Sequence, residues 1–392
     1  MSLALGFVKL RSLTWCDSDL TSILTLKLFL PTLEALSFKF YIDNEPFFKA
    51  VIPGLRTAAP RLKALEFRGM SPTSDSTSEI ESLLLSYPEG LTALSLPCCD
   101  ISSSLLHHIA PWTRLQWLTL KLGHNSIPTV PFHAYASQPF LALTHLHILC
   151  EDLGRFVSFL RAFQIIRMNS DTRSFGYPNL KQYIILTRTN LEHLILTESC
   201  HHQACPNASS SFDLHPLLID PTALADLKTL VISPVKSSSI ALTDSDILIL
   251  ARTCPYLEIL RVCNTPVSLH ALRILASCCR ELCEVSLCLD ARLDALGAAP
   301  PDNDQVALKP NMRLIKLLIG PSPIACVGPL DPPTAPDLMR SIPRFLNAMV
   351  PRLSTFFRMP GEEESRKIYQ ERWYAVLTTL SAMAKGEVED SD

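Results

Sequence analysis

Cysteine and histidine side chains gather at one point of the sequence, in the stretch Cys200-His201-His202-x-x-Cys205, and His215 follows shortly after it. Thiolate sulfur and imidazole nitrogen are ligands that zinc prefers, so this stretch is the strongest metal-site candidate in the chain. A second C-x2-C or H-x3-H pair does not follow, and two adjacent histidines rarely reach one metal together. We therefore interpret the stretch as a solvated loop and predict no metal site.

Motifs of nucleophilic or phosphate chemistry are missing from the sequence. It contains no G-x-S-x-G, no H-E-x-x-H, no P-loop and no G-x-G-x-x-G, and it has only 12 glycines. Cys278, Cys279, Cys283 and Cys288 recur in register with a repeated apolar pattern, and we interpret them as small buried thiols. We predict that the protein is not an enzyme and holds no cofactor.

Charged, aromatic and imidazole side chains occupy the polar positions of several short alternating segments. Successive side chains of a strand point to opposite faces, and neighbouring parallel strands lie about 4.8 Å apart, so these residues would form one exposed field. An exposed Trp flanked by cations and imidazoles is typical of an interaction hot spot, although a solvated face without a partner is the alternative. The candidate protein-binding residues are Lys39, Glu66, Arg68, Trp117, Lys121, His145, His147, His193 and Arg261.

The segments that carry these residues share the pattern L-x-x-L-x-apolar. The first leucines are 23 to 48 residues apart, and most steps lie in or near the leucine-rich-repeat period of roughly 20–29 residues. The longest step leaves room for a further strand at Leu180-x-x-Tyr183-x-Ile185, so we expect eleven to twelve strands. The first leucines are Leu10, Leu33, Leu62, Leu91, Leu115, Leu143, Leu191, Leu227, Leu257, Leu282 and Leu314.

Apolar residues at helical spacing lie between these segments, and two of the runs follow capping-box patterns, Ser78-x-x-Glu81 and Thr243-x-x-Asp246. A unit of one strand and one helix cannot bury its apolar side alone, so neighbouring units must stack. We predict an α/β leucine-rich-repeat solenoid, a right-handed horseshoe or arc with parallel strands on the concave face and helices outside. The expected helices include 47–55, 80–85, 105–109, 156–168, 247–251 and 271–276.

The predicted domain organisation is a solenoid over residues 1–355, followed by a C-terminal capping helix and acidic tail over 356–392. Loop insertions rich in Ser, Pro, Ala or Asp are expected at about 197–222, 290–311 and 320–336. The terminal helix carries its apolar residues on one face, which would cover the last open edge of the solenoid. These residues are Tyr369, Trp373, Val376, Leu377, Leu380 and Met383.

The composition narrows the class of partner and the compartment. The 392 residues carry a net charge of -3, which gives no electrostatic reason to expect nucleic acid or an anionic membrane as partner. No apolar run approaches the roughly 18 residues of a membrane-spanning helix. The apolar residues 1–8 precede the basic ones, the reverse of a secretory signal, and the odd number of 13 cysteines fits a reducing compartment. We expect a cytoplasmic or nuclear protein.

Two repeats carry a cysteine behind a helical run, in Cys254-Pro255-x-Leu257-x-x-Leu260 and Cys279-x-x-Leu282-x-x-Val285. They resemble the cysteine-containing leucine-rich repeats of F-box proteins. The irregular steps and the terminal helix from Tyr369 to Met383 are similar to the degenerate repeats of fungal F-box proteins. The resemblance extends over roughly residues 10–353 and is more specific for the fold than for any particular member of the family.

In that family a short helical F-box near the N-terminus docks on a Skp-family adaptor, which links it to a cullin ubiquitin ligase, while the repeats select the substrate. The resemblance therefore implies substrate recognition in ubiquitin-dependent protein degradation. The consensus Leu-Pro-x-Glu-(Ile/Leu)-Leu is not found, since the similar stretch 30–36 already forms the second repeat segment. Because the first repeat begins at Leu10, we expect that the natural polypeptide or its relatives carry a further segment upstream. The chain is then either a truncated F-box protein or a relative that has lost the F-box. The alternative is a leucine-rich-repeat scaffold with no ubiquitin role.

Overall fold

The computed structural model describes residues 10–17, 31–40, 45–69, 74–87, 90–123, 140–151, 156, 159, 191–198, 211–214, 224–234, 239–291, 310–319, 336–353, 355–358 and 364–384. The chain divides into two compact units, Met1–His201 (unit 1) and His202–Asp392 (unit 2). Each unit contains a parallel sheet whose strands follow one another in chain order. Among these residues, no helix has both the length and the apolar character to cross a membrane.

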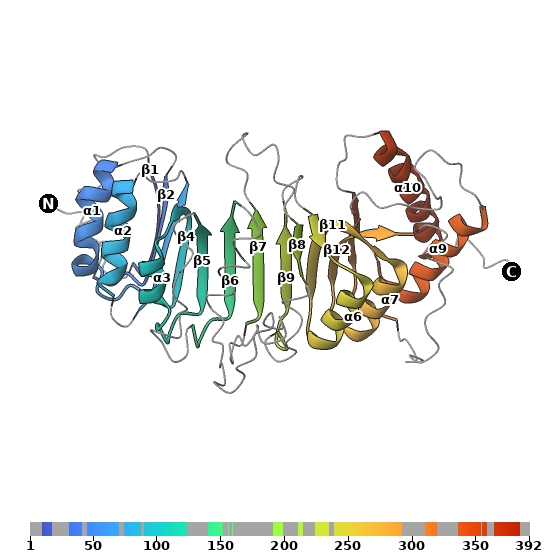
Figure 1. The fold of residues 1–392 in the computed structure, drawn as a ribbon, viewed down its shortest axis with the longest axis horizontal. Helices are drawn as coiled ribbons and strands as arrows, with labels where there is room; N and C mark the ends of the chain where they lie inside the picture. The colour runs from blue at the N-terminus through green and yellow to red at the C-terminus, as the bar shows by residue number, and fades with distance from the viewer. Residues whose placement is uncertain are drawn as a thin grey trace, which may run out of the picture. The chain divides into compact units, whose positions relative to one another are not determined.

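The sheet of unit 1 has seven strands within the described residues, and they lie side by side in chain order (Figure 1). Each strand pairs in parallel with the next, so equivalent repeat positions form rows across the sheet. The strands are β1 (Ser12–Asp17), β2 (Ala35–Phe40), β3 (Ala64–Gly69), β4 (Ala93–Asp100), β5 (Trp117–Leu122), β6 (His145–Cys150) and β7 (His193–Glu198).

The leucine pattern places its apolar residues on the covered face of each strand. In the second repeat, Leu33, Leu36 and Phe38 are all buried. Strands β2, β6 and β7 alternate residue by residue between partly exposed and buried side chains. Each fully buried leucine or phenylalanine contributes about 1.5–3 kcal/mol relative to exposure. The repeated apolar rows are therefore what holds the solenoid together.

A shared backbone acceptor aligns the beginning of most strands of the two parallel sheets. The carbonyl oxygen of Glu34 accepts hydrogen bonds from the amides of Lys63, at 2.7 Å, and Ala64, at 3.0 Å. The same arrangement recurs at Arg11, Lys63, Thr92, Gln116 and Thr144 in unit 1 and at Lys228, Glu258 and Cys283 in unit 2. One carbonyl thus aligns the first residues of the following strand with its own.

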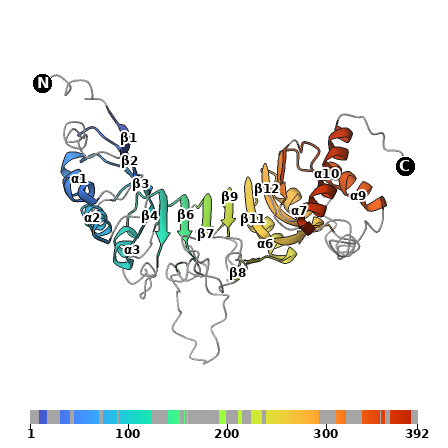
Figure 2. The same cartoon turned by 90° about the horizontal axis from the view of Figure 1, so that it is seen from above.

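Three helices cover one face of the unit 1 sheet (Figure 2). They are α1 (Glu45–Ala58), α2 (Ser74–Leu85) and α3 (Ser103–Ile109). Helix α1 packs against α2, and α2 against α3. The side chain of Ser102 caps α3 by accepting a hydrogen bond from the amide of Leu105. The opposite face carries the partly exposed strand residues and is the one on which a site can lie.

The parallel sheet of unit 2 has five strands among the described residues, and two short strands form a separate pair. The five are β9 (Thr229–Ser233), β11 (Ile259–Ser268), β12 (Glu284–Asp290), β13 (Lys316–Ile319) and β14 (Thr355–Arg358). The separate pair is β8 (Ser211–Asp213) with β10 (Ser239–Ala241). Part of the stretch expected as a loop insertion at 197–222 is thus a strand, because it finds β10 as a partner.

Four helices of unit 2 are described. They are α6 (Asp244–Thr253), α7 (Leu269–Cys278), α9 (Pro336–Met349) and α10 (Glu364–Ala384). The expected capping box at the start of α6 is present: the Thr243 side chain accepts from the Asp246 amide, and the Asp246 carboxylate accepts from the Thr243 amide. Helix α10 packs against α9 and buries Trp373 and Val376.

The α/β fold with stacked parallel strands and leucine-rich repeats is confirmed, and every L-x-x-L segment named above is a strand. Strand β14 was not expected, since Arg358 replaces the last apolar residue of its pattern. The capping box at Ser78 is wrong: α2 already begins at Ser74, which places Ser78 inside the helix. The segment 180–185 and most of the helix expected at 156–168 lie outside the described residues.

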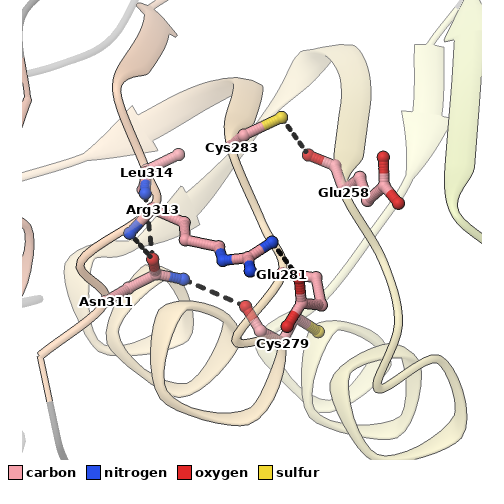
Figure 3. Close-up of polar contacts among 7 residues, drawn as sticks. All are labelled: Glu258, Cys279, Glu281, Cys283, Asn311, Arg313 and Leu314. Carbon is pink, nitrogen blue, oxygen red and sulfur yellow. Dashed lines mark hydrogen bonds and ion pairs between the residues drawn. The ribbon is translucent and has the colours of Figure 1, made fainter.

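A buried turn position precedes each strand of unit 2, and Asn311 fills it in an unusual way (Figure 3). In the preceding repeat the backbone carbonyl of Cys279 accepts the amide of Leu282. Asn311 instead uses its side-chain oxygen to accept the amides of Arg313 and Leu314, and its amide nitrogen donates to the carbonyls of Ala276 and Cys279. This side chain therefore ties the end of α7 to the strand that follows.

Candidate functional site

The register of unit 1 brings three of the expected binding residues into one stack. Trp117 on β5, His145 on β6 and His193 on β7 are successive register partners. The indole and the His145 ring are stacked with centroids 4.3 Å apart, and the two imidazole rings with centroids 4.1 Å apart. We call these three residues the ring stack. Stacked rings contribute about 0.5–1.5 kcal/mol per pair beyond their buried area, so the stack is a rigid feature of the exposed face.

Neighbouring polar groups orient the rings of the stack. The indole Nε1 of Trp117 donates to Thr119 Oγ1 at 3.4 Å, and Nδ1 of His145 lies 2.8 Å from Thr144 Oγ1. Nε2 of His193 lies 3.9 Å from a carboxylate oxygen of Glu192. Trp117 nevertheless keeps 47% of its surface exposed. A large, oriented and partly exposed indole is the kind of anchor on which protein interfaces depend.

A hollow of about 670 Å³ lies beside the ring stack on the exposed face of unit 1. It exists because the row that carries Trp117 holds only small residues on the preceding strands, Ala35, Ala64 and Ala93. Trp117 forms one wall, since Ala93 is too small to cover the indole. We call this hollow the groove. Its lining residues are Ser12, Leu13, Thr14, Ala35, Leu36, Ser37, Ala64, Leu65, Glu66, Arg68, Ala93, Leu94, Ser95, Pro97, Trp117, Thr119 and His147.

Glu66 is the anion of the groove, and its neighbours hold it charged. Its carboxylate accepts hydrogen bonds from the Ser37 hydroxyl at 2.7 Å and from Nε of Arg68 at 2.5 Å. Partial burial by itself would raise the pKa of Glu66, but the Ser37 and Arg68 hydrogen bonds and the Arg68 charge outweigh it, and the pKa lies below its ordinary value. The Glu66 and Arg68 charges therefore cancel within the lining.

His147 adds no charge to the groove near neutral pH. Burial lowers the pKa of this imidazole, because the charged form loses solvation. Its Nε2 lies 3.2 Å from Thr197 Oγ1. With Glu66 paired to Arg68, the lining is close to neutral and presents hydroxyl groups beside a small apolar floor.

Both lysines among the expected binding residues, Lys39 and Lys121, lie outside the groove lining. Lys39 on β2 is partly exposed and is the register partner of Arg68 on β3. Lys121 was expected on the exposed face, but it is only 6% exposed and its Nζ pairs with Asp100 at 3.1 Å. The cause is a shift in the pairing of β4 with β5. Leu96 pairs with Leu120, but the next pair is Asp100 with Lys121, whereas a regular ladder would pair Pro97 with Lys121.

Arg261, the remaining expected binding residue, belongs to unit 2 and is engaged in an ion network. Its Nε lies 2.6 Å from a Glu284 carboxylate oxygen, and Lys316 Nζ lies 3.0 Å from the other oxygen. Burial would raise the pKa of Glu284, but the hydrogen bonds and charges of these two cations hold it below its ordinary value. Arg261 is thus committed to its own sheet and is a weaker binding candidate than the ring stack.

The metal candidate lies beyond what the structure describes, since residues 200–205 and His215 are outside the described ranges. Within those ranges, no cluster of three or more His, Cys, Asp or Glu side chains is placed to hold a metal ion. Buried thiols are present: burial raises the pKa of Cys254 to about 12, and burial also raises the pKa of Cys279. Such thiols are protonated and serve packing. Of the four thiols expected to be buried, Cys279 and Cys288 are buried, but the interpretation is wrong for Cys278, which is exposed, and for Cys283, which is partly exposed.

Sequence reasoning missed the small residues that create the groove. Ala35, Ala64 and Ala93 carry no chemistry of their own, and their importance lies in what they leave open. The signal was nonetheless present, because all three occupy the same repeat position as Trp117. Comparing side-chain size along that position would have predicted a hollow that ends at the indole.

No protein-family model matches the chain, and no curated protein matches its sequence. Solved structures resemble it at low identity, and two of them serve as examples. One is from the crystal structure of the Rad7 and Elc1 complex in yeast, with a TM-score of 0.41 and 16% identity, covering 89% of this chain and 76% of that chain. The other is an internalin (inlF) from Listeria monocytogenes, with a TM-score of 0.36 and 15% identity, covering 90% and 88%. At these values, the fold assignment rests on strand register and repeat pattern.

Proposed function

We propose that the protein is a non-catalytic protein-binding solenoid whose unit 1 binds a segment of another protein in the groove. The observation that carries the proposal is the groove itself: a hollow over three alanines that ends at a half-exposed indole. In many protein interfaces an anchor side chain of the partner fills such a hollow, and a few residues around it contribute most of the binding energy. Ser37 and Ser95 line the groove, and while they hydrogen-bond Glu66 their hydroxyl oxygens can still accept hydrogen bonds from the amides of the partner's backbone.

The partner segment that fits best is extended, uncharged and equipped with an aromatic or long aliphatic side chain. Charge is the reason, because Glu66 and Arg68 neutralise each other and His147 is uncharged near neutral pH. A strongly charged segment would lose solvation without meeting an opposite charge. An apolar anchor would instead bury itself between the alanine floor and the Trp117 indole.

The finer role that we propose is F-box-type substrate recognition for a cullin-based ubiquitin ligase, in the cytoplasm or nucleus. Support comes from the resemblance of the Cys254 and Cys279 repeats to those of F-box proteins. In this role a Skp-family adaptor would bind an F-box module outside the repeats, and the groove would hold the protein to be degraded. The alternative is a scaffold that uses the same groove without any ubiquitin ligase, and fold alone does not separate the two.

The groove is tested by selecting peptides from a displayed random library against the purified chain. We expect enriched peptides with few charges and one large apolar residue. Ala93→Phe, which fills the groove, and Trp117→Ala, which removes its wall, should each weaken binding at least about tenfold, or roughly 1.4 kcal/mol. Arg261→Ala in unit 2 is the matched control and should leave binding unchanged. Highly charged peptides, or binding that survives Ala93→Phe, would contradict the proposal.

The ubiquitin role is tested with the protein and purified ligase components. We expect the protein to co-elute with a Skp-family adaptor and a cullin in gel filtration. If Ala93→Phe leaves this co-elution unchanged, the adaptor binds a surface other than the groove. Failure of the protein to bind any Skp-family adaptor would favour the scaffold.

A further inference from the structure

A bulge near the end of β4 brings two adjacent cysteines into contact. Leu96 pairs with Leu120 on β5, and the next pair is Asp100 with Lys121, so residues 97–99 have no register partner on β5. In a regular strand, adjacent side chains point to opposite faces. Here Cys98 and Cys99 are both buried, 6% and 0% exposed, and their sulfur atoms lie 3.6 Å apart.

The two thiols differ in their surroundings. The Cys98 and Cys99 sulfur atoms share a hydrogen bond in which either thiol can be the donor. This contact lowers the pKa of Cys98 although burial opposes the shift, and the nearby Lys121 ammonium also favours the Cys98 thiolate. The same hydrogen bond, together with burial, raises the pKa of Cys99. The Cys98 thiol also donates a hydrogen bond to the carbonyl oxygen of Phe67 at 3.4 Å. Of the two thiols, the surroundings therefore favour ionisation of Cys98 over that of Cys99.

We propose that Cys98 and Cys99 form a reversible oxidation site, which a peroxide converts from two thiols to an intramolecular disulfide. The Cys98 thiolate attacks one peroxide oxygen and breaks the O–O bond. The other oxygen leaves as hydroxide, becomes water on taking up the thiol proton, and Cys98 becomes a sulfenic acid. The Cys99 sulfur then attacks the Cys98 sulfur, and the sulfenic hydroxyl leaves with the Cys99 proton as a second water. The two thiols lose two electrons and two protons, and the peroxide is reduced to two waters.

The bulge is what allows the sulfurs to close. A disulfide needs them about 2.05 Å apart, so they must approach by about 1.5 Å. Since residues 97–99 have no register partner on β5, this movement breaks no pairing between the two strands. Pro97, which also lines the groove, is the neighbour that would move with them. The oxidation site itself does not depend on what the groove binds.

The chain contains a matched comparison in its other adjacent pair, Cys278 and Cys279. Cys278 is exposed at the end of α7, whereas Cys279 is buried and its sulfur approaches the carbonyl oxygen of Cys254 at 3.4 Å. Sequence adjacency is therefore the same in both pairs, but only Cys98 and Cys99 turn their thiols toward each other in the described structure. A difference in reactivity between the two pairs would therefore result from the placement of their sulfur atoms and not from their adjacency in the sequence.

The test exposes the folded chain to hydrogen peroxide, blocks remaining thiols, and measures peptides by mass spectrometry without reduction. We expect the peptide that contains both Cys98 and Cys99 to lose two hydrogens and to regain them with dithiothreitol. Cys98→Ser and Cys99→Ser should each abolish that product, while Cys278→Ser should leave it unchanged. Blocked or overoxidised single thiols at Cys98 or Cys99 in place of the disulfide would overturn the proposal.

A second measurement on the unaltered chain covers the case in which a serine variant does not fold. Phenylarsine oxide bridges two thiols that lie close together and releases one water. We expect one dithiol-bridged arsenic adduct on the peptide with Cys98 and Cys99, and none on the peptide with Cys278 and Cys279. Equal adducts on both pairs, or none on the first, would show that the contact between the two sulfurs does not govern reactivity.

Discussion

The first residue of each strand sits at the same repeat position in both units, but the side chains there differ in size and charge. In unit 1 the position is small on three successive strands and then becomes a stack of rings; in unit 2 it carries an isoleucine, a glutamate and a lysine, of which the last two form an ion pair. The residues are Ala35, Ala64, Ala93, Trp117, His145 and His193 in unit 1, and Ile259, Glu284 and Lys316 in unit 2.

The difference shows how one repeat produces either a binding surface or a closed one. Leucines on the covered face are common to both sheets and specify only the fold. On the other face, alanines leave a hollow beside Trp117, whereas Glu284 draws Arg261 and Lys316 over its own strands. The side chains at the exposed positions of each repeat therefore decide where a partner can enter.

Removing the anion of unit 2 should have the largest effect. Glu284→Ala leaves Arg261 and Lys316 close together without their shared carboxylate, and we expect unit 2 to lose about 1–3 kcal/mol of stability. Hydrogen exchange should locate the loss in β11, β12 and β13. The exposed pair Glu34 and Lys63 in unit 1 is the control, since Glu34→Ala should change exchange very little. Equal losses of stability from Glu284→Ala and Glu34→Ala would mean that the ion network of unit 2 is no stronger than an exposed ion pair of unit 1.

Lowering the pH should weaken both units through their carboxylates. The pKa of Glu66 and that of Glu284 are lowered by folding from the ordinary value of 4.5, so the unfolded chain binds these protons first. Their contribution is present in full above the unfolded pKa and is lost as the pH falls through the folded pKa. Urea midpoints measured from about pH 6 to about pH 3 should fall, and Glu284→Gln should flatten the decrease. A decrease that is unchanged in this variant would exclude Glu284 as a contributor.

Truncating the indole should cost less than removing Glu284. Trp117→Ala takes one ring from the stack on a half-exposed face, and we expect a loss of about 0.5–1.5 kcal/mol in unit 1. Denaturation followed by circular dichroism provides the measurement, and Trp117→Phe, which retains a stackable ring, should recover most of the loss. A larger loss, comparable to that of a core leucine, would mean that the ring is part of the core and not of a binding face.

Filling the hollow should have the smallest effect on stability. Ala93→Leu places methyl groups in open space beside Trp117, and surface changes of this kind usually stay within about 0.5 kcal/mol. The unfolding midpoint should therefore remain the same while peptide binding decreases. A strong destabilisation would indicate that the groove is too narrow to admit a leucine side chain, and hence a partner's anchor.

The sequence was sufficient for the repeat and for the pairing of Trp117 with His145, because the L-x-x-L pattern sets the register. It did not predict that His145 and His193 are neighbours, since the strand expected at 180–185 would have separated them, whereas β6 pairs directly with β7. Strand β14 escaped because Arg358 interrupts the apolar pattern, although Phe356 keeps its middle position. The regular pattern thus predicts strands reliably only where every apolar position is filled.

The features that could not be predicted arise where pairing departs from the regular ladder. Lys121 alternates outward in the sequence pattern, yet the bulge at residues 97–99 buries it against Asp100. The same bulge creates the contact between Cys98 and Cys99, whose adjacency in a regular strand would keep them apart. Neither result follows from the periodicity of the sequence, because a bulge changes the strand register without changing the leucine pattern.

The carbonyl that accepts two amides at the start of most strands has a consequence for how such a chain can diversify. It joins Thr144 to Glu192 and His193 across the longest interval between repeats, just as it joins Glu34 to Lys63 and Ala64 across a much shorter one. The register of a strand is therefore set by hydrogen bonds at its first residues, whatever the length of the segment that connects it to the preceding strand. Connecting segments are free to lengthen, acquire new sequences or accept a grafted module, while the rows of side chains on the sheet remain in step.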